Sequence, residues 1–268
     1  MKKLIILAAL LLPVTAGAQG VAARASIGMD YKIQKGLHLE MQEELRIADG
    51  LSGINSLRTT AGLSWKASDY FKFGGSYTLI RKPSGDPRHR VCADATASYR
   101  LGDLQFSLKE KLQLTHRTDD SLNVYQSVRN ALALKSRVGV KYKGLKDYYG
   151  LEPFAYFELR TALNEPWGVV SGDAQKTNSG REYYTYTHTG YTHIYNNRYR
   201  ANLGVDYSPA RHHTFTLNVL LDWCSDYVID TNGPSKWETD KGVRLFTDTT
   251  GWNDYFRGSL CLGYVLSF

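Results

Sequence analysis

Segments of about ten residues in which apolar and polar residues alternate recur along this chain. Residues 57–66 read Leu-Arg-Thr-Thr-Ala-Gly-Leu-Ser-Trp-Lys, and residues 215–224 read Phe-Thr-Leu-Asn-Val-Leu-Leu-Asp-Trp-Cys. Successive strand residues point to opposite sides of a sheet, so each segment predicts a strand with one apolar and one polar face. Ordinary strands have about five or six residues, whereas about ten residues at a tilt of about 45° cross a bilayer. The pattern predicts an all-β protein whose strands are long enough to span a membrane.

Further features favour a membrane barrel over a soluble β-sandwich. The polar faces carry Gly, Ser, Thr and charged residues, which suit a hydrated or hydrogen-bonded lumen. Aromatic residues such as Trp65, Tyr99 and Tyr142 stand at the ends of segments, as in the girdles of membrane barrels. The last segment alternates up to Phe268, the final residue. Such an ending resembles the assembly signal of bacterial outer-membrane barrels, so the barrel-assembly machinery is an expected partner.

The number of strands follows from the segments. Ten strands are predicted at 37–47, 57–66, 70–80, 90–100, 104–115, 128–142, 151–162, 188–207, 213–224 and 254–268. Residues 23–33 alternate as well and would make eleven, whereas single-chain bacterial barrels normally have an even number. Either this segment pairs irregularly near the seam, or the 225–253 loop contains another strand near Val243 to Thr247. We therefore predict a closed antiparallel transmembrane β-barrel of 10–12 strands.

The connections alternate in length along the chain. Short connections are expected at 67–69, 101–103, 143–150 and 208–212, and long ones at 48–56, 82–89, 116–127, 164–182 and 225–253. Outer-membrane barrels have short periplasmic turns and long extracellular loops, which assigns both sets. The segment 183–207 is too long for one crossing. Its first part, beginning at Glu182, is expected to stand above the membrane.

The N-terminus has the features of an export signal. Lys2 and Lys3 precede a short apolar core, and Ala16-Gly17-Ala18 fits the small-x-small cleavage rule. We expect residues 1–18 to be removed and residues 19–268 to form one barrel domain in the cell outer membrane. No later run of about 18 apolar residues predicts a membrane helix. The net charge of +7 comes without a compact Lys/Arg block, so nucleic acid is not an expected partner.

Four stretches resemble one family, the outer-membrane β-barrels catalogued as domain of unknown function 2490. They are Gln42-Glu-Glu-Leu-Arg46, residues 88–100 with Arg88-His-Arg90, Leu134-Lys-Ser-Arg-Val-Gly-Val-Lys-Tyr142 and Leu151-Glu-Pro-Phe-Ala-Tyr-Phe-Glu-Leu159. Their order and spacing carry the resemblance, which extends over nearly all the mature chain. It implies an outer-membrane barrel and supplies no activity and no catalytic residues.

Charged residues on the polar faces are the first functional candidates. By alternation they are Glu40, Glu44, Arg46, Arg58, Lys109, Lys111, Lys135, Arg137, Lys141, Glu152, Glu158, Arg160, Arg198, Arg200, Asp206 and Asp222. Both signs are present, and charges removed from water must be paired. A barrel of eight strands is filled by its own side chains, and wide channels need about sixteen. We therefore favour a filled or narrow lumen over an open pore.

Other polar residues suggest narrower roles. Arg81, Lys82, Arg88 and Arg90 flank one predicted extracellular loop, where they could pair with lipopolysaccharide phosphates. Glu43 and Glu110 fall on the lipid-facing phase, either near an interface or at a protein contact or β-bulge.

The cysteines and histidines offer weaker indications of chemistry. Cys92, Cys224 and Cys261 fall on the lumen phase as small fillers, although a disulfide between Cys224 and Cys261 is conceivable in an oxidising compartment. His212 and His213 are interpreted as turn residues, and no closely spaced ligand set predicts a metal. No cofactor is expected.

Three classes of function stay open. The leading one is a non-enzymatic structural or interaction barrel, or a narrow channel. The second is a lipid-modifying hydrolase, for which His188 and His193 lie in the richest region, 187–197. That region lacks the nucleophile pattern of outer-membrane phospholipases. The third is a ligand-binding barrel that uses Tyr-rich loops at 164–190 and 225–253.

Overall fold

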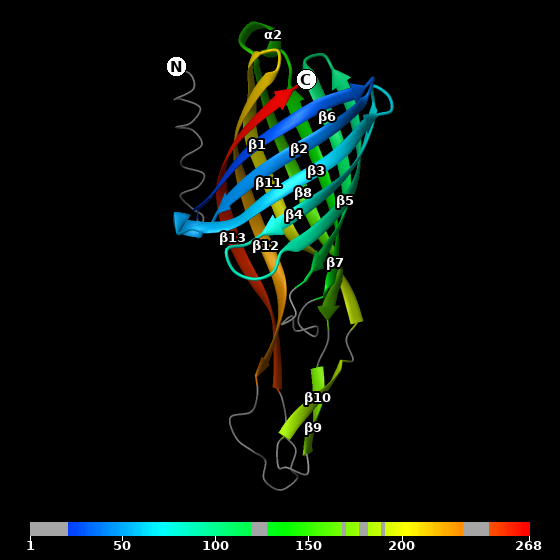
Figure 1. Cartoon of the computed structure of the whole chain (residues 1–268), viewed down its shortest axis with the longest axis vertical. Coiled ribbons are helices and arrows are strands. Elements are labelled where there is room, and N and C mark those ends of the chain that lie inside the picture. The colour runs from blue at the N-terminus through cyan, green and yellow to red at the C-terminus, as the bar shows by residue number, and fades with distance from the viewer. Residues whose placement is uncertain (1–20, 119–127, 168–169, 177–181, 189–190, 233–246) are drawn as a thin grey trace.

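Eleven strands form a closed barrel in a computed structural model, which describes residues 21–118, 128–167, 170–176, 182–188, 191–232 and 247–268 (Figure 1). The barrel strands are β1 (Val21–Gln34), β2 (Leu37–Ile47), β3 (Ile54–Lys66), β4 (Phe71–Arg81), β5 (Arg88–Leu101), β6 (Leu104–Arg117), β7 (Asn130–Tyr142), β8 (Leu151–Trp167), β11 (Tyr191–Ala210), β12 (His213–Asn232) and β13 (Thr247–Ser267). The predicted all-β closed barrel is confirmed, and eleven lies within the predicted 10–12. In the described part of the chain, no helix is long and apolar enough to cross a membrane.

The barrel closes through a parallel seam between β1 and β13 (Figure 1). Val21 lies opposite Gly258 and Asp30 opposite Ser267, while all other barrel pairs are antiparallel. The amide of Phe268 donates to the carbonyl of Asp30 at 2.9 Å, which carries the seam to the last residue. An odd number of strands requires one parallel pair, since antiparallel neighbours alternate in direction around the ring. The irregular seam predicted for residues 23–33 is therefore present, and the alternative strand near Val243 lies outside the described residues except for Thr247.

The two ends of the barrel differ. At one end the connections are short, and the longest of them contains the helix α2 (Lys146–Tyr149). At the other end lie the longer connections, one of which contains the 3-10 turn η1 (Asp49–Leu51). The connection between β8 and β11 contains β9 (Val170–Lys176) and β10 (Glu182–His188), a two-stranded sheet beyond the rim (Figure 1). The first part of 183–207 therefore forms β10, outside the barrel, and its place above the membrane stays a prediction.

Apolar side chains lie on the outer face of the barrel, and polar side chains lie on its inner face. Each barrel strand carries a large apolar side chain that is 45–60% exposed on its outer face: Ile27, Met41, Leu63, Phe73, Val91, Leu108, Val138, Phe157, Leu203, Trp223 and Leu262. The inner faces carry the polar residues, and the fully buried side chains there include Asp222, Ser56 and Ser259. A water-soluble protein buries apolar and exposes polar groups. This barrel does the reverse.

Candidate functional site

A row of charged residues runs around the inner wall through direct cross-strand neighbours. It consists, in order from β6 to β13, of Lys109, Arg137, Glu158, Arg200, Asp222 and Arg257. Opposite charges placed directly across a sheet stabilise it. From Arg137 onward the signs alternate, so this part of the row is a ladder of ion pairs at one level of the lumen.

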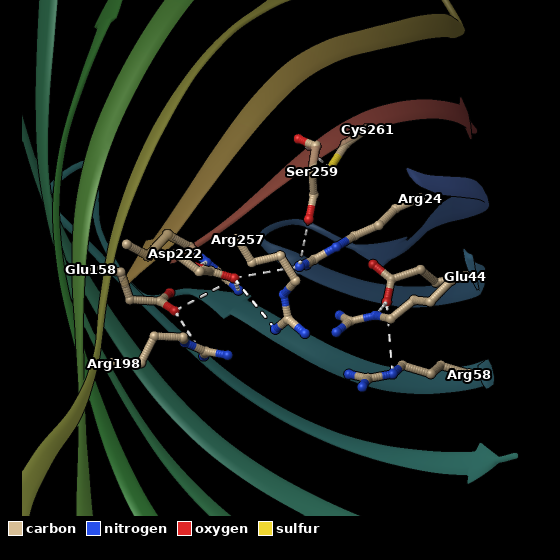
Figure 2. A network of polar contacts seen from close by, with 11 residues as sticks. Arg24, Glu44, Arg58, Glu158, Arg198, Asp222, Arg257, Ser259 and Cys261 are labelled. Atoms are coloured by element: carbon tan, nitrogen blue, oxygen red, sulfur yellow. Dashed lines mark hydrogen bonds and ion pairs between the residues drawn. The ribbon is translucent and has the colours of Figure 1, made fainter. Parts of the chain in front are cut away.

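Asp222 is the centre of the ladder. Its side chain is fully buried and accepts hydrogen bonds from Nε and Nη2 of Arg200 at 2.6 and 2.8 Å. Arg24, on β1, approaches the same carboxylate at 3.6 Å, and Arg257, on β13, at 3.9 Å. Figure 2 shows the guanidinium groups of Arg24 and Arg257 approaching Asp222 from different strands. A bidentate Arg–carboxylate pair fixes geometry as well as charge, so Asp222 ties the wall to the seam strand β1.

Glu158 has the same arrangement one step along the ladder. Its carboxylate accepts hydrogen bonds from Arg137, the shorter of 2.6 Å, and lies 3.6 Å from both Arg198 and Arg200. Glu158 is only 3% exposed. Three cations therefore surround each of these two carboxylates, so positive charge is in excess.

A second ion-pair group lies on β2 and β3, beside the seam strand β1, where Arg46 is directly opposite Arg24 (Figure 2). Glu44 accepts a hydrogen bond from Nε of Arg46 at 2.5 Å, and Arg58 stands 3.9 Å away. Nε of Arg58 is buried and, among the described residues, makes no hydrogen bond. The same holds for Nε of Arg198 and Arg257. The excess of guanidinium groups thus leaves several donors unused.

Two cavities of the lumen lie in the half nearer the short turns, and a smaller one of about 50 Å³ lies beside Arg24 and Arg257, toward the long connections. One of about 370 Å³ is lined by Lys141, Phe154 and Asp206, and another of about 170 Å³ by Glu40, Lys72 and Asp94. Both share lining residues with a smaller cavity of about 70 Å³ beside Glu158 and Arg200. Beyond it lie the buried side chains of the ladder. The lumen therefore narrows from the short-turn end toward a packed, charged layer.

The structure places the charged lumen candidates at different levels. Those that belong to the packed charged layer are Glu44, Arg46, Arg58, Arg137, Glu158, Arg198, Arg200 and Asp222. Glu40, bonded to Ser64 and Lys72, lies nearer the short turns. Glu152 pairs there with Lys143 and, at 3.4 Å, with Lys146 of α2. Arg160 lies directly opposite Lys135 on the inner wall, toward the long connections.

The four lipopolysaccharide candidates do not form one patch. Nη2 of Arg81 donates to Oγ1 of Thr59 at 3.1 Å on the outer wall. Arg88 and Arg90 lie on the inner face of β5, and Nε of Arg90 donates to Oγ1 of Thr115 at 3.2 Å. Partial burial lowers the pKa of the Lys82 ammonium, and the charges of Arg88 and Arg117 lower it further. Arg81 thus lies on the outer wall, whereas Lys82 lies at the rim near Arg88 and Arg117.

Two carboxylates lie on the apolar outer wall, as their phase indicated. Glu43 accepts a hydrogen bond from Oγ1 of Thr59 at 2.6 Å, and Glu110 accepts one from Oγ of Ser136 at 2.7 Å. Each partner comes from a neighbouring strand and faces the same side. Hydrogen bonding reduces the cost of a carboxyl group on an apolar surface.

Cys224 and Cys261 do not form the disulfide considered from the sequence. Cys224 lies opposite Tyr255 and Cys261 opposite Asn218 on neighbouring strands, so the two are about six residues out of register, or about 20 Å. A disulfide needs Cα atoms within about 7 Å. All three cysteines are free and buried on the inner wall, as small fillers would be.

Among the described residues, the side chains form no catalytic or metal-binding arrangement of the kinds considered from the sequence. There, no serine hydroxyl is hydrogen-bonded to a histidine ring, and no group of three metal-ligating side chains gathers. His212 bonds the carbonyl of Ser267, and His213 bonds Tyr264. The side chains of His188 and His193, together with most of the loops at 164–190 and 225–253, lie outside the residues described in atomic detail.

Sequence reasoning missed two members of the charged layer, Arg24 and Arg257. Arg257 shares the alternating phase of Ser259 and Cys261, so period two alone would have included it. Arg24 lies at the start of β1 and reaches Asp222 only because β1 pairs in parallel with β13. Its place depended on the irregular seam.

The chain matches the model of a known protein family. The family model described as "Protein of unknown function (DUF2490)" matches residues 25–176. All four stretches noted in the sequence fall inside this range, although the resemblance had been expected over nearly the whole mature chain. No curated protein matches the chain.

Proposed function

The chain belongs to the DUF2490 family of proteins of unknown function, and from that premise we propose that it is an integral outer-membrane barrel with a closed lumen and a non-enzymatic, structural or interaction role. The observation that carries the proposal is the distribution of apolar and charged side chains between the two faces of the barrel wall. Apolar side chains on every strand face outward, and charged side chains fill the interior. Only a surrounding apolar phase makes such a distribution favourable.

The orientation follows from the two ends. Short turns face the periplasm and long connections face outward in outer-membrane barrels. Exposed aromatic side chains near the short turns, including Trp65, Phe71, Tyr99 and Phe215, support a girdle at that interface. Arg81 and Lys82 then lie at the outer rim, where lipopolysaccharide phosphates are expected partners. Export by a cleaved segment 1–18 and assembly through the strand ending at Phe268 are parts of the same proposal.

A closed lumen is supported by burial in the charged layer. Asp222, Glu158, Asn202 and Arg200 are at most 7% exposed, although they face the interior of the barrel. An open water path at this level would leave them solvated. The ion-paired side chains therefore fill the lumen at this level, which argues against a diffusion channel.

The test is conductance in planar bilayers after refolding, with a heat-dependent shift in gel mobility as evidence of folding. The wild-type protein should give no stable steps. Replacing Glu158, Arg200, Asp222 and Arg257 together by alanine removes two charges of each sign from the layer, and steps should then appear. The matched pair Glu40→Ala and Lys72→Ala, nearer the short turns, should stay silent. Steps from the wild-type protein would contradict the closed lumen.

A further inference from the structure

Four cationic side chains form a square on the inner wall of β6 and β7. Lys109 lies directly opposite Arg137, and Lys111 directly opposite Lys135. Members of each strand are two residues apart, so all four point to the same side. We call Lys109, Lys111, Lys135 and Arg137 the cationic square.

Such an arrangement is unfavourable by itself. Like charges directly opposite each other destabilise a sheet. Lys135 is also flanked on its other side by Arg160, so three cations stand in succession across β6, β7 and β8. The charges that act most strongly on Lys135 include Arg198 and Arg90 besides Glu158.

The protein supplies too few carboxylates for the square. Asp94 lies 2.8 Å from Lys109 and 3.8 Å from Lys111, and Glu158 pairs with Arg137 at 2.6 Å. Lys135 has no carboxylate at ion-pair distance among the described residues. Glu158 is shared with Arg198 and Arg200, so it cannot serve Lys135 fully. A net positive charge stays on the square.

The square also lines a space of suitable size. The cavity of about 70 Å³ is bounded by the square together with Glu158 and Arg200. A single water needs about 10–15 Å³ by this measure, so a small anion fits in place of several waters. The neighbouring cavities at Asp94 and at Lys141 share lining residues with it and lie toward the short turns. An anion can therefore arrive from that end.

We propose that the cationic square binds a doubly charged oxyanion of the phosphate class. Ammonium and guanidinium groups together give several N–H donors, and phosphate accepts through several oxygens. The same site would take a free inorganic oxyanion or the phosphate of a small solute. A bound dianion would offset the repulsion within the square. The site does not depend on the lumen being closed further along.

The test is isothermal titration of the full chain, folded in detergent, with inorganic phosphate, sulfate and glycerol phosphate. Saturable binding of phosphate and sulfate is expected, and added salt should weaken it. Glycerol phosphate binding with equal affinity would identify a substituted solute as an admissible ligand, whereas its exclusion would restrict the site to free oxyanions. Both results keep the proposal.

Lys135→Met is the decisive variant, since it keeps the apolar stem and removes the charge. Its affinity for phosphate should fall at least about tenfold, a loss of about 1.4 kcal/mol. Lys111→Met is the second variant, to be used if the first fails the gel-mobility test of folding. The control is Lys66→Met, which removes one exposed charge away from the cavity and should leave affinity unchanged.

The same titration also defines what would overturn the proposal. Absence of saturable binding by the folded wild-type protein would do so, as would equal affinity in Lys135→Met and the wild-type protein. Neither result bears on membrane insertion or closure of the lumen, which conductance and gel mobility report separately.

Discussion

Replacement of Asp222 by asparagine should destabilise the barrel more than any other single loss of charge in the lumen. The substitution keeps the shape of the side chain and removes its charge. Asp222 is fully buried, and its carboxylate is bonded at 2.6 and 2.8 Å by Arg200. Arg24 and Arg257 depend on the same group at 3.6 and 3.9 Å. Three guanidinium groups would lose the negative charge that they share.

The size of the effect can be derived in two ways. Each charge-assisted hydrogen bond contributes about 1.5–3 kcal/mol. An asparagine amide has only one acceptor oxygen, so one bond from Arg200 would be lost and the other would lose its charge, together about 3–5 kcal/mol. Removal of one partner of a buried ion pair costs about 3–5 kcal/mol because the other charge is left uncompensated. The two estimates agree on a loss of about 3–5 kcal/mol in the free energy of unfolding.

The assay is urea unfolding and refolding in lipid, with the folded fraction read from gel mobility. The midpoint should fall while the slope stays unchanged, since the surface exposed on unfolding is the same. Asp69→Asn is the control, because Asp69 forms an exposed ion pair with Lys66 at 2.7 Å, and it should leave the midpoint in place. A loss below about 1 kcal/mol for Asp222→Asn, the range of surface ion pairs, would refute the reasoning.

Three other predictions concern the seam, one turn and the outer wall. Cysteines at Ala25 and Leu262, which lie opposite each other across the parallel seam, should cross-link in a background without the native cysteines. The pair Ala25 and Leu266 should not, and the reverse pattern would contradict the register. Gly150→Ala should lower the unfolding midpoint more than Gly102→Ala. Both glycines have positive φ, but only at Gly150 would a Cβ meet a backbone oxygen, that of Ser208. Equal midpoints for the two variants would contradict the prediction, since they would mean that the backbone moves away from the added Cβ without loss of stability. Glu110→Leu should raise the free energy of unfolding in a phospholipid bilayer by about 1 kcal/mol, since a carboxyl group on the lipid face is unfavourable. A decrease would place Glu110 against water or a protein partner instead of lipid.

The strands could be predicted because each one carries its own period-two pattern. The segment 37–47 was predicted with the bounds of β2, and most others differ by a few residues at their ends. The larger differences are in β8, β12 and β13, which continue beyond the predicted crossings toward the long connections. Alternation weakens there, since both faces of a strand beyond the apolar belt can be polar.

Which charges meet could not be predicted from the same pattern. Alternation places Glu158, Arg200 and Asp222 on the inner face, but it does not say that they are direct neighbours. Register decides that, and a shift of two residues would keep every side chain on its face while exchanging all ion-pair partners. The cationic square has the same origin, since only the register of β6 against β7 sets Lys111 opposite Lys135.

The sequence by itself determined that this chain forms long strands with apolar outer and polar inner faces, because that property belongs to each strand separately. Only the tertiary structure decided that eleven strands close through a parallel seam and that Arg24 joins Asp222. It also decided that the inner charges form a packed ladder beside a site with excess positive charge. These features depend on pairing between segments far apart in the chain, which hydrogen bonds and register fix only when the barrel closes.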